Sequence, residues 1–370
     1  MKYDYVVVGA GFAGSVISER AANKLNKKVL LIEQRNHIGG NSYDCYDEYG
    51  ILVHKYGPHI FHTSSEEVWS YVSKFTKWNL YQHEVLGFID GQYVPIPFNL
   101  NTLHALFSSP LADKIEKKLL DKFGFDKKVP ILELKKARDK DLKYLADFVY
   151  KKVFLNYTIK QWGIRPEDIS PQVTARVPVF ISRDNRYFQD KFQGMPQLGY
   201  ADIFNKMLVN KNIKINLGTD YKKVIRKLSY KKLVYTGPID YFFDYKFGKL
   251  AYRSLDFEFT NFKREHYQRA SVINYPNDYK FTRITEFKGL TWQKAASTTI
   301  IKEYPKNCEP GKDIPYYPIL DDENAKRYKQ YEEEAKKFKD VIFIGRLAEY
   351  KYYNMDAVIE SALNKFKELR

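Results

Sequence analysis

The 370-residue sequence predicts an α/β protein in which a parallel-sheet domain, discontinuous in sequence, encloses a helical domain and an antiparallel β-sheet domain. Three observations predict this. The chain is too long for one typical core. Its first 78 residues alternate between strand-like and helix-like runs. Strand-like apolar runs then return at residues 213–217, 232–237 and 341–346, long after the first domain is interrupted.

The opening of the chain carries the strongest local signal. A buried strand, Tyr5–Val8, runs into glycines at positions 9, 11 and 14 and then into a helix, and a second strand ends on Glu33. Gly9 permits the tight turn, Gly11 lets a pyrophosphate approach the backbone, and Gly14 lets the helix pack on the strand. Glu33, 19 residues after Gly14, is placed to accept hydrogen bonds from a ribose. We therefore expect a Rossmann-like dinucleotide site.

A second glycine motif narrows the cofactor. Arg35 is followed four residues later by Gly39-Gly40, a loop that flavin enzymes place beside the pyrophosphate and that NAD enzymes generally lack. Near the C-terminus, Gly345-Arg346 precedes a helix that starts near Asn354, whose N-terminus suits the electron-rich end of an isoalloxazine. The sequence therefore predicts FAD.

The predicted organisation has three parts. The FAD-binding domain comprises residues 1–78, 200–240 and 326–370. The helical domain spans 100–172, with a mobile loop near 165–183. The remaining segments, 79–99, 173–199 and 241–325, form the antiparallel sheet, with strands expected at Val177–Ile181, Ser271–Tyr275, Phe281–Phe287 and Ser297–Glu303. The last helix has one apolar face, formed by Val358, Ile359, Ala362, Leu363, Lys365, Phe366 and Leu369.

Composition limits the functional classes. The formal net charge of +16 suits an anionic partner, but lysines gather on a predicted helical stretch, Lys114 to Lys143, where a solvated face is the simpler reading. No zinc-finger spacing or RNA-binding aromatic motif is present, which disfavours nucleic acid. The 31 tyrosines suit sugar or base contacts, or a tyrosine-rich core. Cys45 and Cys308 form no motif, and no apolar run is long enough for a membrane span, so we expect a cytoplasmic protein.

A set of motifs along nearly the whole chain resembles the UDP-galactopyranose mutase family, and the bacterial-type members in length. The motifs are Lys55–Thr63, Thr158–Gly163, Tyr235–Asp240, Tyr245–Gly248, Tyr252–Leu255, Phe281–Ile284, Pro315–Pro318 and Arg346–Tyr353. They occur in the family's order between residue 3 and about residue 363.

The resemblance implies an isomerase that interconverts UDP-galactopyranose and UDP-galactofuranose. Reduced FAD would act as a covalent nucleophile with no net redox change, supplied with electrons by an external reductant. The enzyme would be a cytoplasmic homodimer whose product feeds cell-surface galactofuranose glycans. Two other readings stay open: a conventional FAD-dependent oxidoreductase of the amine-oxidase-like superfamily, and an inert nucleotide-sugar or FAD-binding protein.

The resemblance also implies roles for residues. Arg176 and Arg283 match the arginines that hold the diphosphate, although the spacing of Arg283 alone favours a surface arginine on a half-exposed sheet. The implied substrate-binding residues are Phe154, Thr158 and Trp162 around the uridine, with Tyr187, Asn79, Asn274, Tyr316 and Tyr352. The spacing of Phe154, Thr158 and Trp162 describes an ordinary buried helix stripe as well. The predicted cofactor-binding residues are Gly9, Gly11, Phe12, Gly14, Glu33, Gln34, Gly39, Gly40, Asn41, His59, Gly237, Arg346, Tyr352, Asn354 and Met355.

His59 and His62 lie three residues apart and invite a metal site. No nearby cysteine or acid completes a coordination set, so we expect no metal. The resemblance places His59 against the isoalloxazine, with catalytic influence on its electron density; a structural histidine is the alternative for both residues.

Two positions depart from the family pattern. Asn354 stands where an aspartate is frequent, and Phe180 stands where bacterial members carry an arginine. If that arginine assists the diphosphate, Phe180→Arg should change the Michaelis constant by no more than about tenfold, or roughly 1.4 kcal/mol.

Overall fold

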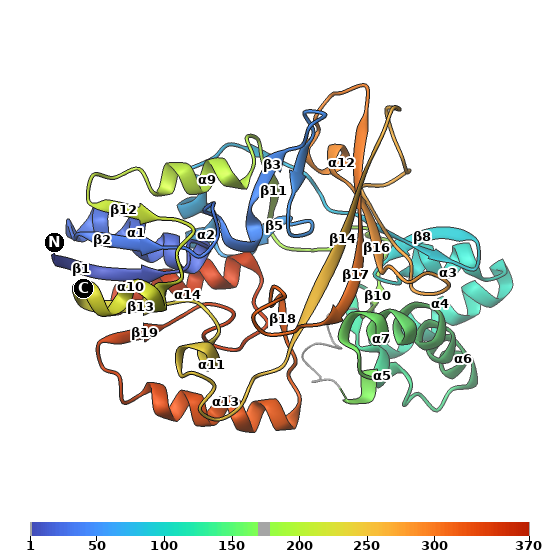
Figure 1. The fold of residues 1–370 in the computed structure, drawn as a ribbon. Coiled ribbons are helices and arrows are strands. Elements are labelled where there is room, and N and C mark those ends of the chain that lie inside the picture. The colour runs from blue at the N-terminus through green and yellow to red at the C-terminus, as the bar shows by residue number, and fades with distance from the viewer. Residues whose placement is uncertain (1, 169–177, 370) are drawn as a thin grey trace. The chain divides into compact units, whose positions relative to one another are not determined.

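The computed structural model describes residues 2–168 and 178–369, which form two compact units (Figure 1). The first unit comprises Met1–Tyr81, Asp190–Tyr252 and Glu309–Arg370, and the second comprises Gln82–Gln189 and Arg253–Cys308. The helices and the antiparallel strands that we assign to separate domains both lie in the second unit. The three-part division and its boundaries therefore stay a prediction.

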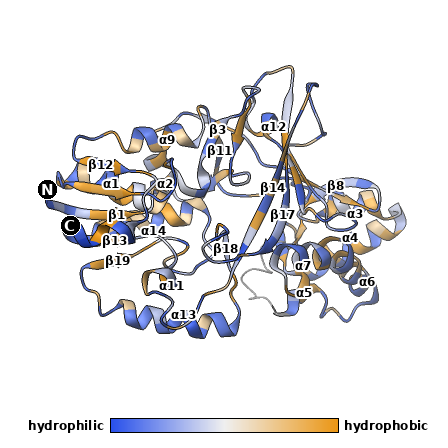
Figure 2. Cartoon of the chain, in the orientation of Figure 1, coloured by the Kyte–Doolittle hydropathy of each residue, from blue (hydrophilic) through white to orange (hydrophobic). Residues whose placement is uncertain are grey.

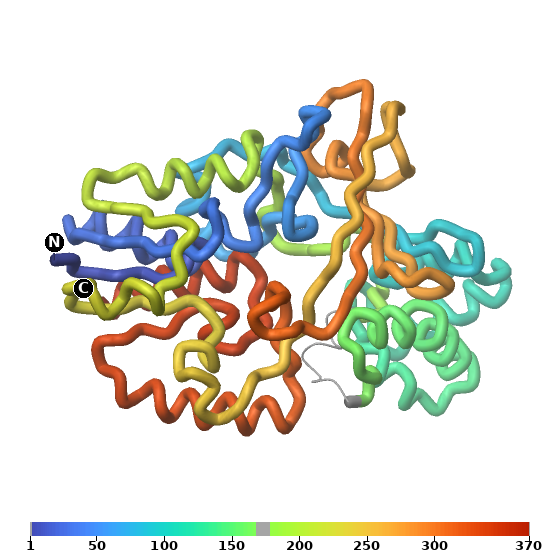
Figure 3. Tube along the Cα trace, viewed as in Figure 1, coloured from blue at the N-terminus to red at the C-terminus, as the bar shows by residue number. Residues whose placement is uncertain are grey.

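A five-stranded parallel sheet forms the centre of the first unit. Its order is β12 (Ile213–Asn216), β2 (Val29–Ile32), β1 (Lys2–Val8), β13 (Ser229–Tyr235) and β19 (Val341–Phe343). All four neighbouring pairs are parallel. Figure 3 shows how N-terminal, central and C-terminal parts of the chain run side by side here. The predicted discontinuous α/β fold is confirmed. The expectation that residues 341–346 form a buried strand is wrong in one respect, because β19 lies at the sheet edge and is only half-buried.

Helices and short strands complete the first unit. The helices are α1 (Phe12–Leu25), α2 (Glu66–Val72), α9 (Tyr200–Met207), α10 (Tyr221–Val224), α11 (Ile239–Phe242), α13 (Asp322–Ala335) and α14 (Met355–Glu368), with 3₁₀ turns at Gly40–Ser42 and Ile225–Lys227. The short strands are β3 (Asp44–Tyr46), β4 (Leu52–His54), β5 (Phe61–Thr63), β6 (Trp78–Asn79), β11 (Phe192–Pro196) and β18 (Tyr317–Pro318). Helix α14 packs on α1 and buries Ile359, Ala362, Leu363 and Phe366, part of the predicted apolar face. Figure 2 contrasts the apolar strands with the hydrophilic α13.

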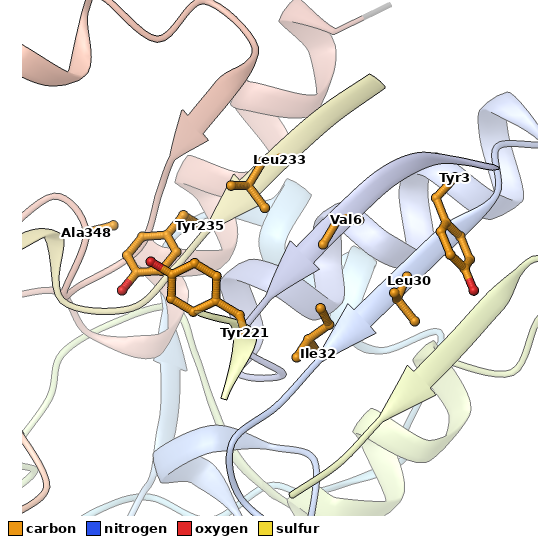
Figure 4. Close-up of a cluster of buried hydrophobic side chains, with 8 residues drawn as sticks. All are labelled: Tyr3, Val6, Leu30, Ile32, Tyr221, Leu233, Tyr235 and Ala348. Carbon is orange, nitrogen blue, oxygen red and sulfur yellow. The ribbon is translucent and has the colours of Figure 1, made fainter. Parts of the chain in front are cut away.

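Tyrosines contribute to the core of this unit. One buried cluster consists of Tyr3, Val6, Leu30, Ile32, Tyr221, Leu233, Tyr235 and Ala348 (Figure 4). The side chains of Val6, Leu30, Ile32 and Leu233 come from three neighbouring strands of the sheet. Tyr235 is 1% exposed, yet its hydroxyl donates to the Pro238 carbonyl at 3.0 Å, so the ring is buried without leaving its polar tip unpaired.

A sheet with the order β14 (Tyr252–Phe262), β17 (Thr298–Asn307), β16 (Arg283–Glu286), β15 (Val272–Asn274), β7 (Val85–Ile89) and β8 (Gln92–Ile96) forms much of the second unit. Its pairs are antiparallel except β15 with β7, which is parallel. Val177 of the run predicted at Val177–Ile181 lies outside the described residues, and Val179–Ile181 form β10, which pairs with β9 (Lys127–Val129) in a separate two-stranded sheet. That part of the prediction is wrong because the edge of β9 supplies its partner.

The helices of the second unit are α3 (Leu100–Leu106), α4 (Ser109–Phe123), α5 (Ile131–Leu134), α6 (Lys140–Val149), α7 (Asn156–Trp162) and α12 (Phe287–Thr291), with a 3₁₀ turn at Pro166–Asp168. A π-helical segment, Tyr150–Leu155, joins α6 to α7. The lysine-rich stretch from Lys114 to Lys143 is not one helix, because Gly124 ends α4 with φ +83° and β9 follows. Among the described helices, none combines the length and apolar character that crossing a membrane requires.

The position of Phe180 predicts an effect of Phe180→Arg on stability, while the expected effect on the Michaelis constant stays a prediction. Phe180 is 2% exposed in β10, and the Lys128 ammonium lies 5.5 Å from its ring centroid. An arginine here would bury a positive charge near the exposed Lys128, which costs about 3 kcal/mol or more. We predict a fall in the melting temperature of about 6 °C or more for Phe180→Arg and a clearly smaller one for Phe180→Leu. Equal melting curves for Phe180→Arg and the wild type would contradict the buried position.

Candidate functional site

Steric contacts explain the glycines between β1 and α1. Gly9 has φ +99°, and a Cβ there would lie 2.1 Å from Thr236 Oγ1. A Cβ on Gly14 would lie 2.0 Å from the Gly9 carbonyl oxygen. Gly11 precedes α1, so the unpaired N–H groups of the first helical turn face the turn that it forms. This is the strand–turn–helix geometry expected of an anion-binding helix N-terminus.

The second glycine loop meets the first through Ala10. The Gly39 N–H donates to the Ala10 carbonyl at 2.9 Å, and the Ala10 N–H donates to Glu33 Oε2 at 2.8 Å. A Cβ on Gly40 would lie only 3.0 Å from Gly11 Cα. The two predicted glycine motifs and Glu33 therefore lie together at the carboxyl ends of β1 and β2. Gln34, by contrast, is exposed.

Arg35 adds a cation to this cluster. Its Nη2 donates to Asn41 Oδ1 at 2.8 Å, and its guanidinium lies over the Tyr56 ring, 4.2 Å from the centroid. Its Nη1 is buried and has no hydrogen-bond partner among the described residues. A buried guanidinium N–H beside two glycine turns suits an anionic ligand. Arg35 thus belongs with the predicted cofactor residues, although only its motif, and not a binding role, follows from the sequence.

The C-terminal motif reaches the same cluster. Ser42 Oγ lies 3.5 Å from Met355 Sδ, the first residue of α14, and a Cβ on Gly345 would lie 3.0 Å from Ala13 Cβ. Asn354 is the N-cap of α14. The N-terminus of α14 therefore lies beside the glycine cluster, and its predicted place at the isoalloxazine stays a prediction. Phe12 is buried against Phe204 and Tyr200, which makes it a packing residue of α1.

Arg346 gathers aromatic residues from two separate motifs. Its Nη1 donates to the Tyr316 carbonyl at 3.0 Å, and its other terminal nitrogen donates to the Tyr353 carbonyl. The guanidinium carbon lies 5.7 and 5.9 Å from the ring centroids of Tyr317 and Tyr352. Tyr316, Tyr352 and Arg346, predicted from segments 30 residues apart, are thus neighbours. Gly237 lies in the turn after β13, where a Cβ would meet the Tyr235 hydroxyl at 2.8 Å.

His59 and His62 occupy different environments. The His59 Nδ1 pairs with the Gly57 carbonyl at 2.8 Å, and its backbone N–H donates to His54 Nδ1. Burial lowers the pKa of His59 to about 4, and the charge of Arg346 acts in the same direction, so the ring is neutral at physiological pH. His62 Nδ1 instead contacts Asp190 Oδ2 at 2.8 Å. In the part of the chain that the structure describes, no three His, Cys, Asp or Glu side chains group as metal ligands.

In the second unit, three site residues form a row across neighbouring strands. Asn274 on β15 faces Arg283 on β16, and Arg283 faces Glu303 on β17. Arg283 Nε lies 3.5 Å from Glu303 Oε1, and its Nη2 donates to the Tyr157 hydroxyl at 2.5 Å. Burial raises the pKa of Glu303, which Arg283 opposes, and burial raises the pKa of Tyr157 to about 12. Arg283 is therefore held between an acid and a hydroxyl.

Neither Tyr157 nor Glu303 is among the residues predicted from the sequence. Tyr157 directly precedes Thr158, and Glu303 ends the predicted strand Ser297–Glu303. Only the strand register places Glu303 opposite Arg283, so no motif could have identified it.

The helical segment that carries the predicted uridine residues is anchored at its end. Phe154, Thr158 and Trp162 are all buried, which both the uridine reading and an ordinary core stripe require. Gly163 ends α7 with φ +73°, and the buried Arg253 donates to the carbonyls of Gln161 and Lys160 at 2.9 and 3.0 Å. Tyr187 donates its backbone N–H to the His83 carbonyl at 2.7 Å, and its hydroxyl contributes to the electrostatics of Tyr157.

This cluster does not include three of the predicted substrate-binding residues, Asn79, Tyr316 and Tyr352, which belong to the first unit. Asn79 lies on β6 of the first unit, paired with Met195. Arg176 lies outside the described residues, together with the rest of segment 169–177 of the predicted mobile loop.

The fold and the glycine cluster define a protein with a Rossmann-like domain. The model of the NAD(P)-binding Rossmann-like domain matches residues 7–75, which contain both glycine motifs. A second match is more specific: the family model of UDP-galactopyranose mutase covers residues 152–352. The chain belongs to this family of isomerases.

Full-length relatives agree with that assignment. A dTDP-fucopyranose mutase of Escherichia coli is 37% identical over 97% of this chain and 96% of the relative. A probable UDP-galactopyranose mutase of Klebsiella pneumoniae is also 37% identical, over 98% of this chain and 94% of the relative. In fold, the chain resembles a reduced UDP-galactopyranose mutase, with a TM-score of 0.74 at 17% identity over 100% of this chain and 94% of the other. A putrescine oxidase shares the fold more distantly, with a TM-score of 0.61 at 8% identity, over 100% of this chain and 99% of the oxidase.

The contact at Gly14 gives a direct test of the glycine cluster. Because a Cβ there would lie 2.0 Å from the Gly9 carbonyl, Gly14→Ala should shift α1 away from β1 and cost about 3 kcal/mol. Gly50→Ala is the matched control, since its φ of +75° is strained but its Cβ meets nothing within 4 Å. We expect thermal unfolding to show at least twice the loss for Gly14→Ala. Equal losses would contradict the close helix–strand contact.

Proposed function

We propose that this chain interconverts UDP-galactopyranose and UDP-galactofuranose and uses FAD as its cofactor. The observation that carries the proposal is the fixed guanidinium of Arg283, the middle member of the row, which contacts Glu303 on β17 and Tyr157 on α7. A planar, permanently charged fork suits a diphosphate. Membership of the mutase family supplies the reaction type.

The residues of the glycine cluster fit FAD. Each carboxylate oxygen of Glu33 accepts one backbone N–H, from Ala10 or Arg35, and retains capacity for ribose hydroxyls. The buried Nη1 of Arg35 suits a pyrophosphate oxygen, since no described residue accepts its proton. The glycine turns let the backbone approach that pyrophosphate closely, and the N-terminus of α14 would face the flavin end. Gly9, Gly11, Gly14, Gly39, Gly40, Asn41, Asn354 and Met355 complete the proposed cofactor residues.

When bound and reduced, FAD would supply the nucleophile for an isomerisation in which substrate and product have the same oxidation state. The side chains of the protein then have three tasks. Arg283, with Arg176, holds the diphosphate through the departure and return of the nucleotide, which keeps the leaving group from escaping. The neutral His59 offers a hydrogen bond without adding positive charge beside the flavin. Asn354, which stands where an aspartate is frequent in the family, would offer an amide and no negative charge beside the flavin.

We assign the sugar and base contacts from the side chains available to make them. Asn274 Oδ1 is buried and has no hydrogen-bond partner among the described residues, so it is suited to accept a hydroxyl proton of the substrate. Its neighbour in the row is Arg283. Phe154, Thr158 and Trp162 would hold the uridine, and Tyr187, Tyr316, Tyr352 and Asn79 would contact the sugar or diphosphate.

A thymidine nucleotide of fucose is the second candidate substrate. The relative named dTDP-fucopyranose mutase is as similar to this chain as the Klebsiella relative, at 37% identity. The same ring contraction serves both sugars, so the same diphosphate site would serve both. We favour UDP-galactose because the family model and several relatives carry that name.

We also propose that the enzyme acts as a homodimer in the cytoplasm, receives electrons from an external reductant, and supplies galactofuranose for surface glycans. The family resemblance supports these points. An oxidase-type reaction is disfavoured because the putrescine oxidase likeness, at 8% identity, extends to the fold alone.

The experiment that tests the proposed function is a product assay with the purified, FAD-loaded protein. UDP-galactofuranose and dTDP-fucofuranose are supplied separately, with and without prior dithionite reduction, and products are separated by chromatography. We expect UDP-galactopyranose to form only with the reduced enzyme. Faster conversion of the dTDP sugar would reassign the substrate, and no conversion of either sugar would overturn the proposal.

Arg283→Ala should weaken UDP binding strongly. Loss of a charge-assisted, bidentate diphosphate contact costs about 2.7 kcal/mol, or roughly a hundredfold in Kd. Arg269→Ala is the control, because Arg269 belongs to the same unit but lies over the Tyr93 ring. Calorimetric titration with UDP should show less than about a twofold change for the control. A similar Kd for both variants would remove Arg283 from the diphosphate site.

A further inference from the structure

A single lysine holds the loop between β15 and β16. The Nζ of Lys160, on α7, donates to the carbonyl oxygens of Tyr275, Tyr279 and Phe281 at 2.5, 3.0 and 3.1 Å. A lysine ammonium has three N–H donors, so one side chain uses its full bonding capacity on one loop. Three carbonyls that converge on one cation fix the path of the backbone between them.

Asn277 supplies a second connection between the same loop and the same helix. Its Nδ2 donates to the Lys152 carbonyl at 2.8 Å, and its Oδ1 accepts from Asn156 Nδ2 at 2.8 Å. Lys152, Asn156 and Lys160 are spaced by four residues, as are Phe154, Thr158 and Trp162. The helix therefore presents one row of residues to the loop and a different, buried row to the interior.

The loop begins and ends at residues of the candidate site. Asn274 directly precedes it, and Arg283 directly follows Thr282. The two flanking strands are short, with three and four residues, so their register alone constrains the loop weakly. Arg283 also contacts Tyr157, on the helix that carries Lys160. The position of the loop on the helix therefore determines how Arg283 and Asn274 lie relative to Thr158 and Trp162.

We propose that Lys160 is a positioning residue, whose ammonium fixes the Tyr275–Thr282 loop on the helix and so places Arg283 and Asn274 for the diphosphate sugar. The inference rests on the proposed function only in its choice of ligand. Lys160 itself need not touch the ligand.

Because Lys160 is charged, the proposal predicts that UDP affinity depends on pH. Burial lowers the pKa of Lys160 to about 8, and Asp278 on the loop opposes this effect. The other charged neighbour is Arg253 on β14, which donates to the Lys160 carbonyl. Below pH 8 the ammonium donates to all three carbonyls; above pH 8 the neutral amine has only two N–H groups and no charge. The anion UDP favours the protonated form, so its affinity should be full below pH 8 and fall as the pH rises from 8 to 9.

Three variants separate positioning from general stability. Lys160→Met removes the ammonium, and Lys160→Arg keeps a charge that does not titrate below pH 9. Lys152→Met is the matched control, because its ammonium contacts Asp90 and its unchanged backbone carbonyl still accepts from Asn277. UDP affinity is measured by calorimetry at pH 7 and pH 9 on each full-length protein, together with its melting temperature.

We expect Lys160→Met to raise the UDP Kd about tenfold at pH 7, with no further change at pH 9. The wild type and Lys152→Met should lose affinity between pH 7 and pH 9, and Lys160→Arg should not. A wild-type Kd in Lys160→Met, or a pH dependence that persists in Lys160→Arg, overturns the positioning role. If Lys160→Met does not fold, the pH dependence of UDP affinity in the wild type and in Lys160→Arg still tests the positioning role. A wild type that binds no UDP at pH 7 contradicts the proposed function instead.

Discussion

The backbone N–H and carbonyl of Ala10 connect three chain segments of the first unit. Its N–H donates to Glu33 at the end of β2, and its carbonyl accepts the Gly39 N–H from the second glycine loop. The turn between these bonds leaves no room for a side chain at Gly9, where a Cβ would lie 2.1 Å from Thr236 Oγ1, and little at Gly40, where it would lie 3.0 Å from Gly11 Cα. The cost of a misplaced atom is high in a close-packed interior. The two hydrogen bonds of Ala10 therefore help to fix the position of α1 and of the backbone N–H groups that could face a pyrophosphate.

A comparable constraint acts in the second unit through strand register. A one-residue slip of β16 would move Arg283 to the opposite face of the sheet and separate it from Glu303 and Asn274. The helix from Tyr150 to Trp162 opposes such a slip, because Tyr157 contacts Arg283 and Lys160 holds the loop before it. Arg253 in turn anchors the end of that helix through two carbonyls. A network of polar contacts, each with a named partner, thus places one guanidinium.

Much of the fold follows from the sequence, but the details that complete the site do not. The spacing of the glycines at positions 9, 11 and 14 predicts a strand–turn–helix, because few other backbone structures require glycine at these three positions. The strands near residues 213 and 232 follow from the apolar pattern of their sequences. The partial burial of β19 and the pairing of β10 with β9 depend on which strands are neighbours in the fold. The periodicity of the sequence does not predict those neighbours. Glu303 and Tyr157 depend on register and on the packing of a helix. Phe180 shows the same limit, because its burial, and with it the cost of placing an arginine there, does not follow from the sequence.

The central claim is that the enzyme uses a flavin without net transfer of electrons to or from the sugar. The most direct test is to reduce the FAD-loaded protein anaerobically with one equivalent of dithionite, add excess UDP-galactofuranose, and record the flavin absorbance while product is counted. We predict many molecules of UDP-galactopyranose per flavin, with the flavin still reduced at the end. One oxidised flavin for each molecule of sugar converted would contradict the account and indicate an oxidoreductase.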